Sequence, residues 1–173
     1  VYSGAGNATR FGLFPFLGGG EKQLLVSLDV PRGGRQWVVS LSRGVRVIFD
    51  GDEFAVGREG DDMALADMDG DGVYELRLLL TAFYGFSEWA LAPAATPLPA
   101  VVFKYDAGAR KYLPANRHFA PRLLADADDR KKKVSGPEDP ARHLSDILSL
   151  VLDYVLAGEE RAVRDRACQR QDG

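Results

Sequence analysis

Four acids in one short, glycine-containing segment are the residues with the clearest chemistry. The segment Asp67-Met-Asp-Gly-Asp-Gly-Val-Tyr-Glu75 places carboxylates at positions 1, 3, 5 and 9. Such close carboxylates repel one another unless a cation neutralises them, and calcium prefers about six to eight oxygen ligands at short range. Gly70 and Gly72 allow the backbone to curl so that alternate side chains converge. The spacing therefore predicts a calcium site. Its expected ligands are the side chains of Asp67, Asp69, Asp71 and Glu75 and the backbone carbonyl of Val73.

Two other interpretations of this segment compete with a hairpin calcium site, and the first of them, an EF-hand, fails. An EF-hand loop requires Glu at its twelfth position, where this chain has Leu78, and it requires flanking helices, whereas residues 73–80 have the pattern of a strand. A solvated turn between two strands is the second alternative, because Asp and Gly are favoured in turns for local reasons. The stretch 50–75 contains ten acids and one base, Arg58, and this excess attracts cations. We therefore favour the calcium interpretation.

A second group of candidate residues is aromatic. Phe83, Tyr84, Phe86 and Trp89 lie beside Glu88. Exposed rings near a carboxylate suit sugar binding, so one alternative function is a carbohydrate-binding module that uses Tyr84 and Trp89. The other interpretation is that these rings are buried in the protein core. Glu88 paired with an aspartate gives a hydrolase as a second alternative. Nothing in the sequence fixes the separation of such a pair, and no catalytic residue is assigned.

Composition excludes several function classes. The chain has 173 residues, of which 46% are hydrophobic and 27% charged, which suits one globular domain or a domain with an appendage. A net charge of −3 does not indicate nucleic-acid binding. His118 and His143 have no Cys or His at zinc-ligand spacing. The most apolar stretches are short or interrupted by Asp and Pro, so we expect no transmembrane segment.

Residues 1–120 have the sequence pattern of β-strands. Strand-like runs cover 23–30, 36–41, 45–49, 73–84 and 98–105, and Gly and Asp turns separate them. This spacing predicts an antiparallel meander rather than βαβ units. Val45, Val47 and Phe49 alternate with Arg46 and Ile48, which predicts one wetter face for that strand.

Residues 121–173 have the sequence pattern of helices. A polar helix is expected over 122–133, and a second helix begins with Asp139 as N-cap and Pro140 at the first helical position and ends at Gly158. Its apolar stripe consists of Leu144, Ile147, Leu148, Val151, Leu152, Val155 and Leu156. A last, charged helix is expected over 159–169. The predicted fold is thus α+β: an antiparallel β domain (1–120), propeller-like or sandwich-like, followed by a helical segment (121–173) packed on it.

Residues 66–76, Ala-Asp-Met-Asp-Gly-Asp-Gly-Val-Tyr-Glu-Leu, resemble the calcium hairpin of integrin-type FG-GAP and VCBS repeats. Those repeats are common in exported bacterial proteins and bind calcium between two strands. The resemblance implies the same ligand set that the spacing predicts. The resemblance is limited to this hairpin. A closed propeller needs at least about four blades of four strands, and this chain is long enough for about two blades.

A looser resemblance covers more of the chain. Segments 57–60, 81–84, 97–106 and 111–116 look like an uncharacterised family of bacterial, exported proteins that carry one such hairpin. This resemblance implies an extracytoplasmic location, whether periplasmic, secreted or lipid-anchored. The expected function is therefore a calcium-binding extracytoplasmic domain with a structural or interaction role and a protein or glycan partner. The identity of the partner and the oligomeric state stay open.

Overall fold

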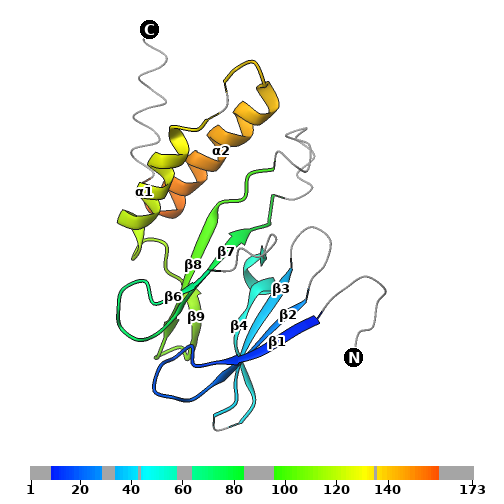
Figure 1. The fold of residues 1–173 in the computed structure, drawn as a ribbon, viewed down its shortest axis with the longest axis vertical. Coiled ribbons are helices and arrows are strands. Elements are labelled where there is room, and N and C mark those ends of the chain that lie inside the picture. The colour runs from blue at the N-terminus through cyan, green and yellow to red at the C-terminus, as the bar shows by residue number, and fades with distance from the viewer. Residues whose placement is uncertain are drawn as a thin grey trace. The chain divides into compact units, whose positions relative to one another are not determined.

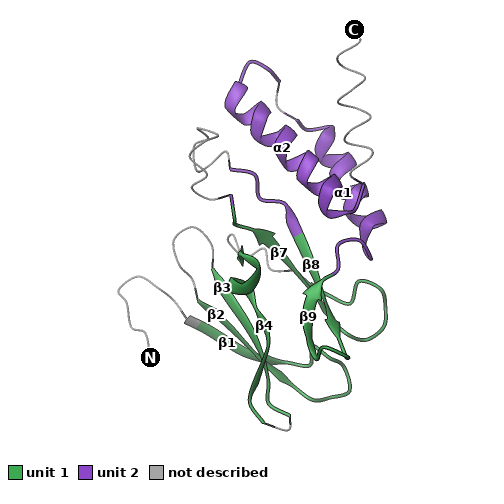
Figure 2. Cartoon of the chain, turned by 180° about the vertical axis from the view of Figure 1, so that it is seen from behind, with its two compact units in different colours: residues 1–82, 101–114 green, residues 83–100, 115–173 purple. Residues whose placement is uncertain are grey.

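The computed structural model describes residues 9–28, 34–42, 44–57, 64–83, 96–134 and 136–159. This part of the chain contains antiparallel sheets followed by two helices, so the predicted α+β class is confirmed (Figure 1). The chain forms two compact units: residues 1–82 with 101–114, and residues 83–100 with 115–173 (Figure 2). The domain boundary expected at residue 120 stays a prediction.

The first sheet is a four-stranded antiparallel meander in chain order. Its strands are β1 (Thr9–Phe14), β2 (Gln23–Leu28), β3 (Arg35–Ser40) and β4 (Arg46–Asp50). The turn between β1 and β2 contains three glycines with positive φ, a conformation that L side chains rarely adopt. Gln23 fixes this turn, because its Oε1 accepts the N–H of Leu17 at 3.2 Å and its Nε2 donates to the carbonyl of Glu21 at 3.0 Å.

The second sheet has the order β5-β7-β8-β9, with β6 paired to β7. A short 3₁₀ helix over Gly51–Phe54 precedes it, and the side chain of Asp50 caps this helix by accepting the N–H of Asp52 at 3.0 Å. The strands are β5 (Val56–Gly57), β6 (Ala64–Ala66), β7 (Glu75–Leu80), β8 (Ala100–Asp106) and β9 (Lys111–Pro114). The pairs β5–β7, β6–β7 and β8–β9 are antiparallel.

Aromatic rings join the two sheets. Phe49 of β4 packs edge-on against Phe103 of β8, with ring centroids 4.9 Å apart, and lies 6.2 Å from Tyr112 of β9. Phe14 of β1 meets Tyr74, next to β7, at 4.9 Å. Each fully buried large apolar side chain contributes about 1.5–3 kcal/mol. The inner faces of both sheets therefore form one core.

The strand 45–49 does not keep the simple alternation that its sequence suggests. The pairing of β3 with β4 shifts register between Val38 and Val39. As a result Ile48 and Phe49 are both buried, whereas Val45 is 82% exposed and Val47 is 52% exposed. A β-bulge places two successive side chains against one partner, which explains why the apolar positions 45 and 47 are the exposed ones.

The helices α1 (Ala120–Lys131) and α2 (Pro140–Leu156) form a side-by-side pair (Figure 1). The predicted start of α2 is confirmed, because Asp139 Oδ1 accepts the N–H of Arg142 at 3.2 Å. Arg130 of α1 binds the buried Asp153 of α2 at 2.6 Å. Neither helix is long and apolar enough to cross a membrane. Of the helix expected over 159–169, all residues from 160 on lie outside the described part of the chain.

Candidate metal centre

The acidic segment is the loop of a β-hairpin. Strands β6 and β7 pair antiparallel, with Ala66 opposite Glu75, so residues 67–74 form the connection between them. Gly70 and Gly72 have φ values of +77° and +82°. These left-handed conformations suit glycine and let the loop curl, as the sequence predicts.

Asp67 holds the curl in place with its carboxylate. Its Oδ1 accepts the N–H groups of Gly70 at 2.8 Å and Asp71 at 3.0 Å, and its Oδ2 accepts the N–H of Gly72 at 3.0 Å. Asp71 Oδ1 in turn accepts the N–H of Val73 at 2.8 Å. Asp side chains commonly fold back on the following backbone in this way. These bonds determine which carboxylate oxygens face one another.

The three loop aspartates converge as predicted. Asp67, Asp69 and Asp71 each offer one carboxylate oxygen, and these oxygens lie within 4.8 Å of one another. Oxygens bound to one calcium ion lie about 2.3–2.6 Å from it, so two such ligands are at most about 5 Å apart. The observed spacing is compatible with this geometry.

Glu75, the fourth predicted carboxylate, is fully buried at the start of β7. Its Oε2 accepts the N–H of Met68 at 2.7 Å, and its Oε1 lies 3.0 Å from the ammonium of Lys104. A buried carboxylate needs such partners because it has lost its hydration. Glu75 therefore ties both ends of the loop together. The carbonyl of Val73 stays a predicted ligand.

Lys104 is the one residue in contact with the described acidic cluster that the sequence does not predict. It lies on β8, the neighbour of β7 in the sheet. Its Nζ lies 2.8 Å from Asp69 Oδ2, 2.6 Å from Asp71 Oδ2 and 3.0 Å from Glu75 Oε1. The only sequence signal is a single lysine inside the apolar run Ala-Val-Val-Phe-Lys-Tyr, since a half-buried cation in such a run needs a partner.

The electrostatics of the cluster favour the charged forms of Lys104 and Asp71. Burial opposes the charged form of Lys104, but hydrogen bonds to Asp69, Asp71 and Glu75 overcome it and raise the lysine pKa. The hydrogen bond from Lys104, followed by the one from the N–H of Val73, lowers the pKa of Asp71. The loop therefore already attracts one cation, the ammonium of its own chain.

The loop is anchored to the core at its far end. The N–H of Tyr74 donates to the carbonyl of Phe16 at 2.8 Å, and the hydroxyl of Tyr112 donates to the carbonyl of Tyr74 at 2.9 Å. Gly18 lies so close to the loop that a Cβ atom added to Gly18 would be 2.8 Å from the carbonyl oxygen of Gly72. These contacts tie the end of the loop to the turn that follows β1 and to β9.

The remaining sequence-predicted residues either lie outside the described part of the chain or make local contacts. Tyr84, Phe86, Glu88 and Trp89 lie outside the described residues, so the sugar-binding and hydrolase alternatives have no supporting geometry. Of the nearby acids, Asp50 caps the 3₁₀ helix, Asp52 lies 3.4 Å from Arg35, and Glu53 lies 3.6 Å from Lys111. These exposed pairs have local roles.

The geometry of the loop is the basis for any functional inference. Comparison of the chain with protein-family models, curated proteins and solved structures gives no significant match.

Proposed function

We propose that the hairpin loop 67–75 binds one calcium ion and that the chain is a calcium-stabilised domain with a structural or interaction role. The observation that carries this proposal is the convergence of Asp67, Asp69 and Asp71, whose oxygens lie within 4.8 Å of one another. The donors are hard carboxylate oxygens, which suit calcium better than zinc or copper. Magnesium is less favoured, because it requires shorter bonds and stricter octahedral geometry.

The charge of the cluster supports a divalent ion. Four carboxylates and one ammonium give the loop a formal charge of −3. Lys104 neutralises only part of this charge, and mutual repulsion of the remaining carboxylates destabilises the curled conformation of the loop. A divalent cation brings the formal sum to −1 and adds ligand bonds that the ammonium cannot provide.

The loop also offers an entry route for the ion. The side chains of Asp69 and Asp71 are 26% and 44% exposed, so water and ions reach them. Lys104 is on a flexible four-carbon stem, which lets its ammonium move towards solvent when calcium enters. Glu75 is the fixed, buried end of the ligand set and connects the ion to β7. Bound calcium would therefore lock the hairpin onto the core, and no catalytic step is proposed.

The resemblance to exported bacterial proteins supports an extracytoplasmic location, where calcium is available to weak sites. Extracellular calcium modules work with Kd values of about 10⁻⁴ to 10⁻³ M. We extend the proposal to this location and to a protein or glycan partner. A net charge of −3 gives no support to a nucleic-acid partner.

Thermal unfolding in chelator and in calcium tests the proposal. At a free calcium concentration 100 times the Kd, the ion stabilises the folded protein by about 2.7 kcal/mol. We expect this gain in the wild type and its loss in Asp69→Asn and Asp67→Ala. Asp52→Asn is the matched control, because Asp52 is an exposed acid outside the loop. A wild type that ignores calcium, or a gain that survives in Asp69→Asn, contradicts the proposal.

A further inference from the structure

The first sheet presents one face on which apolar side chains predominate. Directly paired residues of antiparallel strands lie on the same face of a sheet. Phe11 pairs with Val26, and Val26 pairs with Trp37. The next such row consists of Leu13, Leu24, Val39 and Val47. With the alternating neighbours along the strands, we define the outer face by its apolar residues Phe11, Leu13, Leu24, Val26, Leu28, Trp37, Val39, Leu41, Val45 and Val47. The same register places two charged residues on this face, where β3 begins and β4 ends: Arg35 and Asp50.

The inner face of the same sheet is the more polar one. Gln23, Ser27, Gln36 and Ser40 alternate with the outer-face residues of β2 and β3, and all four are buried. An antiparallel sheet with one solvated face normally places polar residues outside and apolar residues inside. This sheet has the reverse pattern, so solvation does not explain the composition of the outer face.

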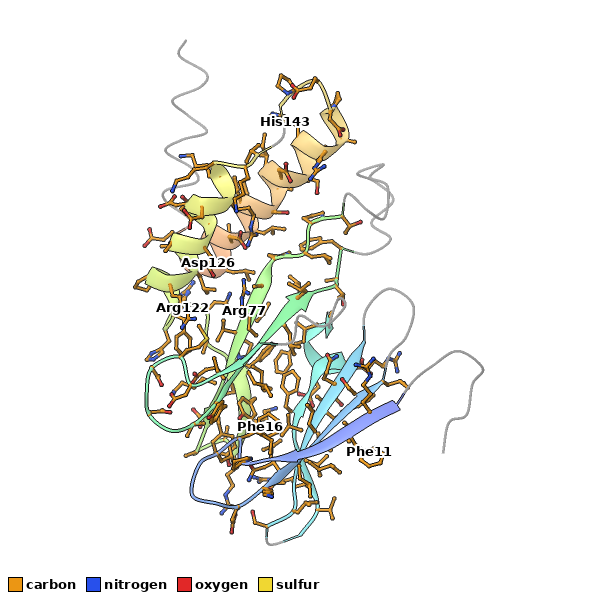
Figure 3. All side chains as sticks on the ribbon, viewed as in Figure 1. Phe11, Phe16, Arg77, Arg122, Asp126 and His143 are labelled. Atoms are coloured by element: carbon orange, nitrogen blue, oxygen red, sulfur yellow. The ribbon has the colours of Figure 1, made fainter. Side chains whose placement is uncertain are left out.

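The outer face is exposed to a degree unusual for large apolar side chains. Phe11 is 78% exposed, Leu13 56%, Leu41 46%, Val45 82% and Val47 52%. Figure 3 shows Phe11 pointing away from the side chains between the two sheets. Among the described residues of the β unit, these five are the exposed large hydrophobics. Contiguous exposed patches of this kind mark interaction sites.

We propose that two copies of this chain associate through their outer faces, sheet on sheet, a role beyond calcium binding. The ten apolar side chains carry no charge, and the two charged residues that the register places on the same face, Arg35 opposite Leu28 and Asp50 opposite Trp37, have opposite signs. The face therefore has no net charge, so two copies meet without net repulsion. Antiparallel sheets commonly pack face to face about 10 Å apart. A two-fold axis makes such a contact closed, because each copy contributes the same patch.

The area of the outer face is sufficient for such a dimer. With about 150–200 Å² for each fully exposed large apolar side chain, the five exposed residues provide about 500–600 Å² per copy. The half-buried residues of the face, including Trp37 on the central strand β3, add to this. Two copies therefore bury about 1,200 Å², the lower end of stable interfaces. Trp37 is the expected energetic centre, since central aromatic residues dominate interfaces.

Sedimentation velocity of the full chain between about 1 and 100 μM tests the dimer. We expect twice the mass of one chain for the wild type at the upper end. Phe11→Lys and Val47→Lys place a charge on the outer face and are expected to weaken association at least tenfold. Both side chains are largely exposed, so neither variant should disturb the fold, which circular dichroism checks. Leu144→Lys is the matched control, an exposed leucine of α2 that should leave the dimer intact.

Three results overturn the proposal. The first is a wild type that remains monomeric over the whole range. The second is a dimer that both outer-face variants leave intact, or that Leu144→Lys also dissociates. The third is a monomer that floats with phosphatidylcholine vesicles and loses this binding in Phe11→Lys, since that outcome assigns the face to lipid. Calcium binding of the monomeric variants is measured separately, so neither result depends on the other.

Discussion

Replacing Lys104 by Met separates the two cations that compete for the hairpin loop. Met keeps the length and apolar packing of the lysine stem and removes the ammonium. In the wild type that ammonium contacts Asp69, Asp71 and Glu75 at 2.6–3.0 Å. We expect the variant to be less stable without calcium and to bind calcium more tightly.

The loss of stability without calcium follows from burial. The Glu75 side chain is fully buried and the Lys104 side chain is 24% exposed. Removing one partner of a buried ion pair costs about 3–5 kcal/mol, and the partial exposure of the lysine favours the lower end. A loss of about 3 kcal/mol lowers the Tm of a chain of this size by about 6–12 °C. The pairs with the more exposed Asp69 and Asp71 add less.

The gain in calcium affinity follows from charge repulsion. When calcium enters the wild-type loop, the ammonium remains nearby even if it swings into solvent. A monovalent and a divalent cation about 7 Å apart in water repel each other by about 1.2 kcal/mol. That energy corresponds to a nearly tenfold change in Kd. Lys104→Met is therefore expected to bind calcium about tenfold more tightly than the wild type.

Thermal unfolding in chelator and calcium titration of the same samples measure both effects. Lys111→Met is the control, since it makes the same change in charge at an exposed pair with Glu53. Equal Tm values of the wild type and Lys104→Met in chelator would refute the ion-pair reasoning. Equal calcium affinities would refute the competition between ammonium and ion, while calcium binding itself would stand.

Three further predictions concern local interactions. The pKa of Asp71 is lowered from 3.8, chiefly by the hydrogen bond from Lys104. The stability that the ionised Asp71 contributes is therefore present above pH 3.8 and is lost as the pH falls through the lowered pKa. Acid unfolding curves should show a smaller loss of stability in Lys104→Met than in the wild type. Asp139→Ala removes the N-cap of α2 and should cost about 1 kcal/mol in urea unfolding. Gly158→Ala should cost about 1–2 kcal/mol, because φ is +86° and an added Cβ meets the Arg117 side chain at 3.1 Å.

Local sequence signals predict the features that depend on neighbouring residues. The Asp and Gly spacing of residues 67–75 predicts a curled loop with converging aspartates, because the side-chain-to-backbone bonds that form it span few residues. Asp139 and Pro140 predict the start of α2 for the same reason. These elements need no information from distant parts of the chain.

Features that depend on strand pairing are not accessible from the sequence alone. The contact of Lys104 with the loop requires β8 to lie beside β7, and the two segments are far apart in the chain. The bulge between Val38 and Val39 decides which side of β4 is buried, and no local signal reveals it. Strand β1 is not predicted either, since its run Thr-Arg-Phe-Gly-Leu-Phe is short and contains a glycine.

The most direct measurement of the central claim is a calorimetric titration of calcium into the chelator-treated chain. We expect a saturable heat with one ion per chain. The heat should be abolished in Asp69→Asn, and Lys104→Met should bind the ion with higher affinity than the wild type. The absence of heat in the wild type and in Lys104→Met alike would contradict the central claim, and the ammonium of Lys104 would then be the cation that the loop is built to hold.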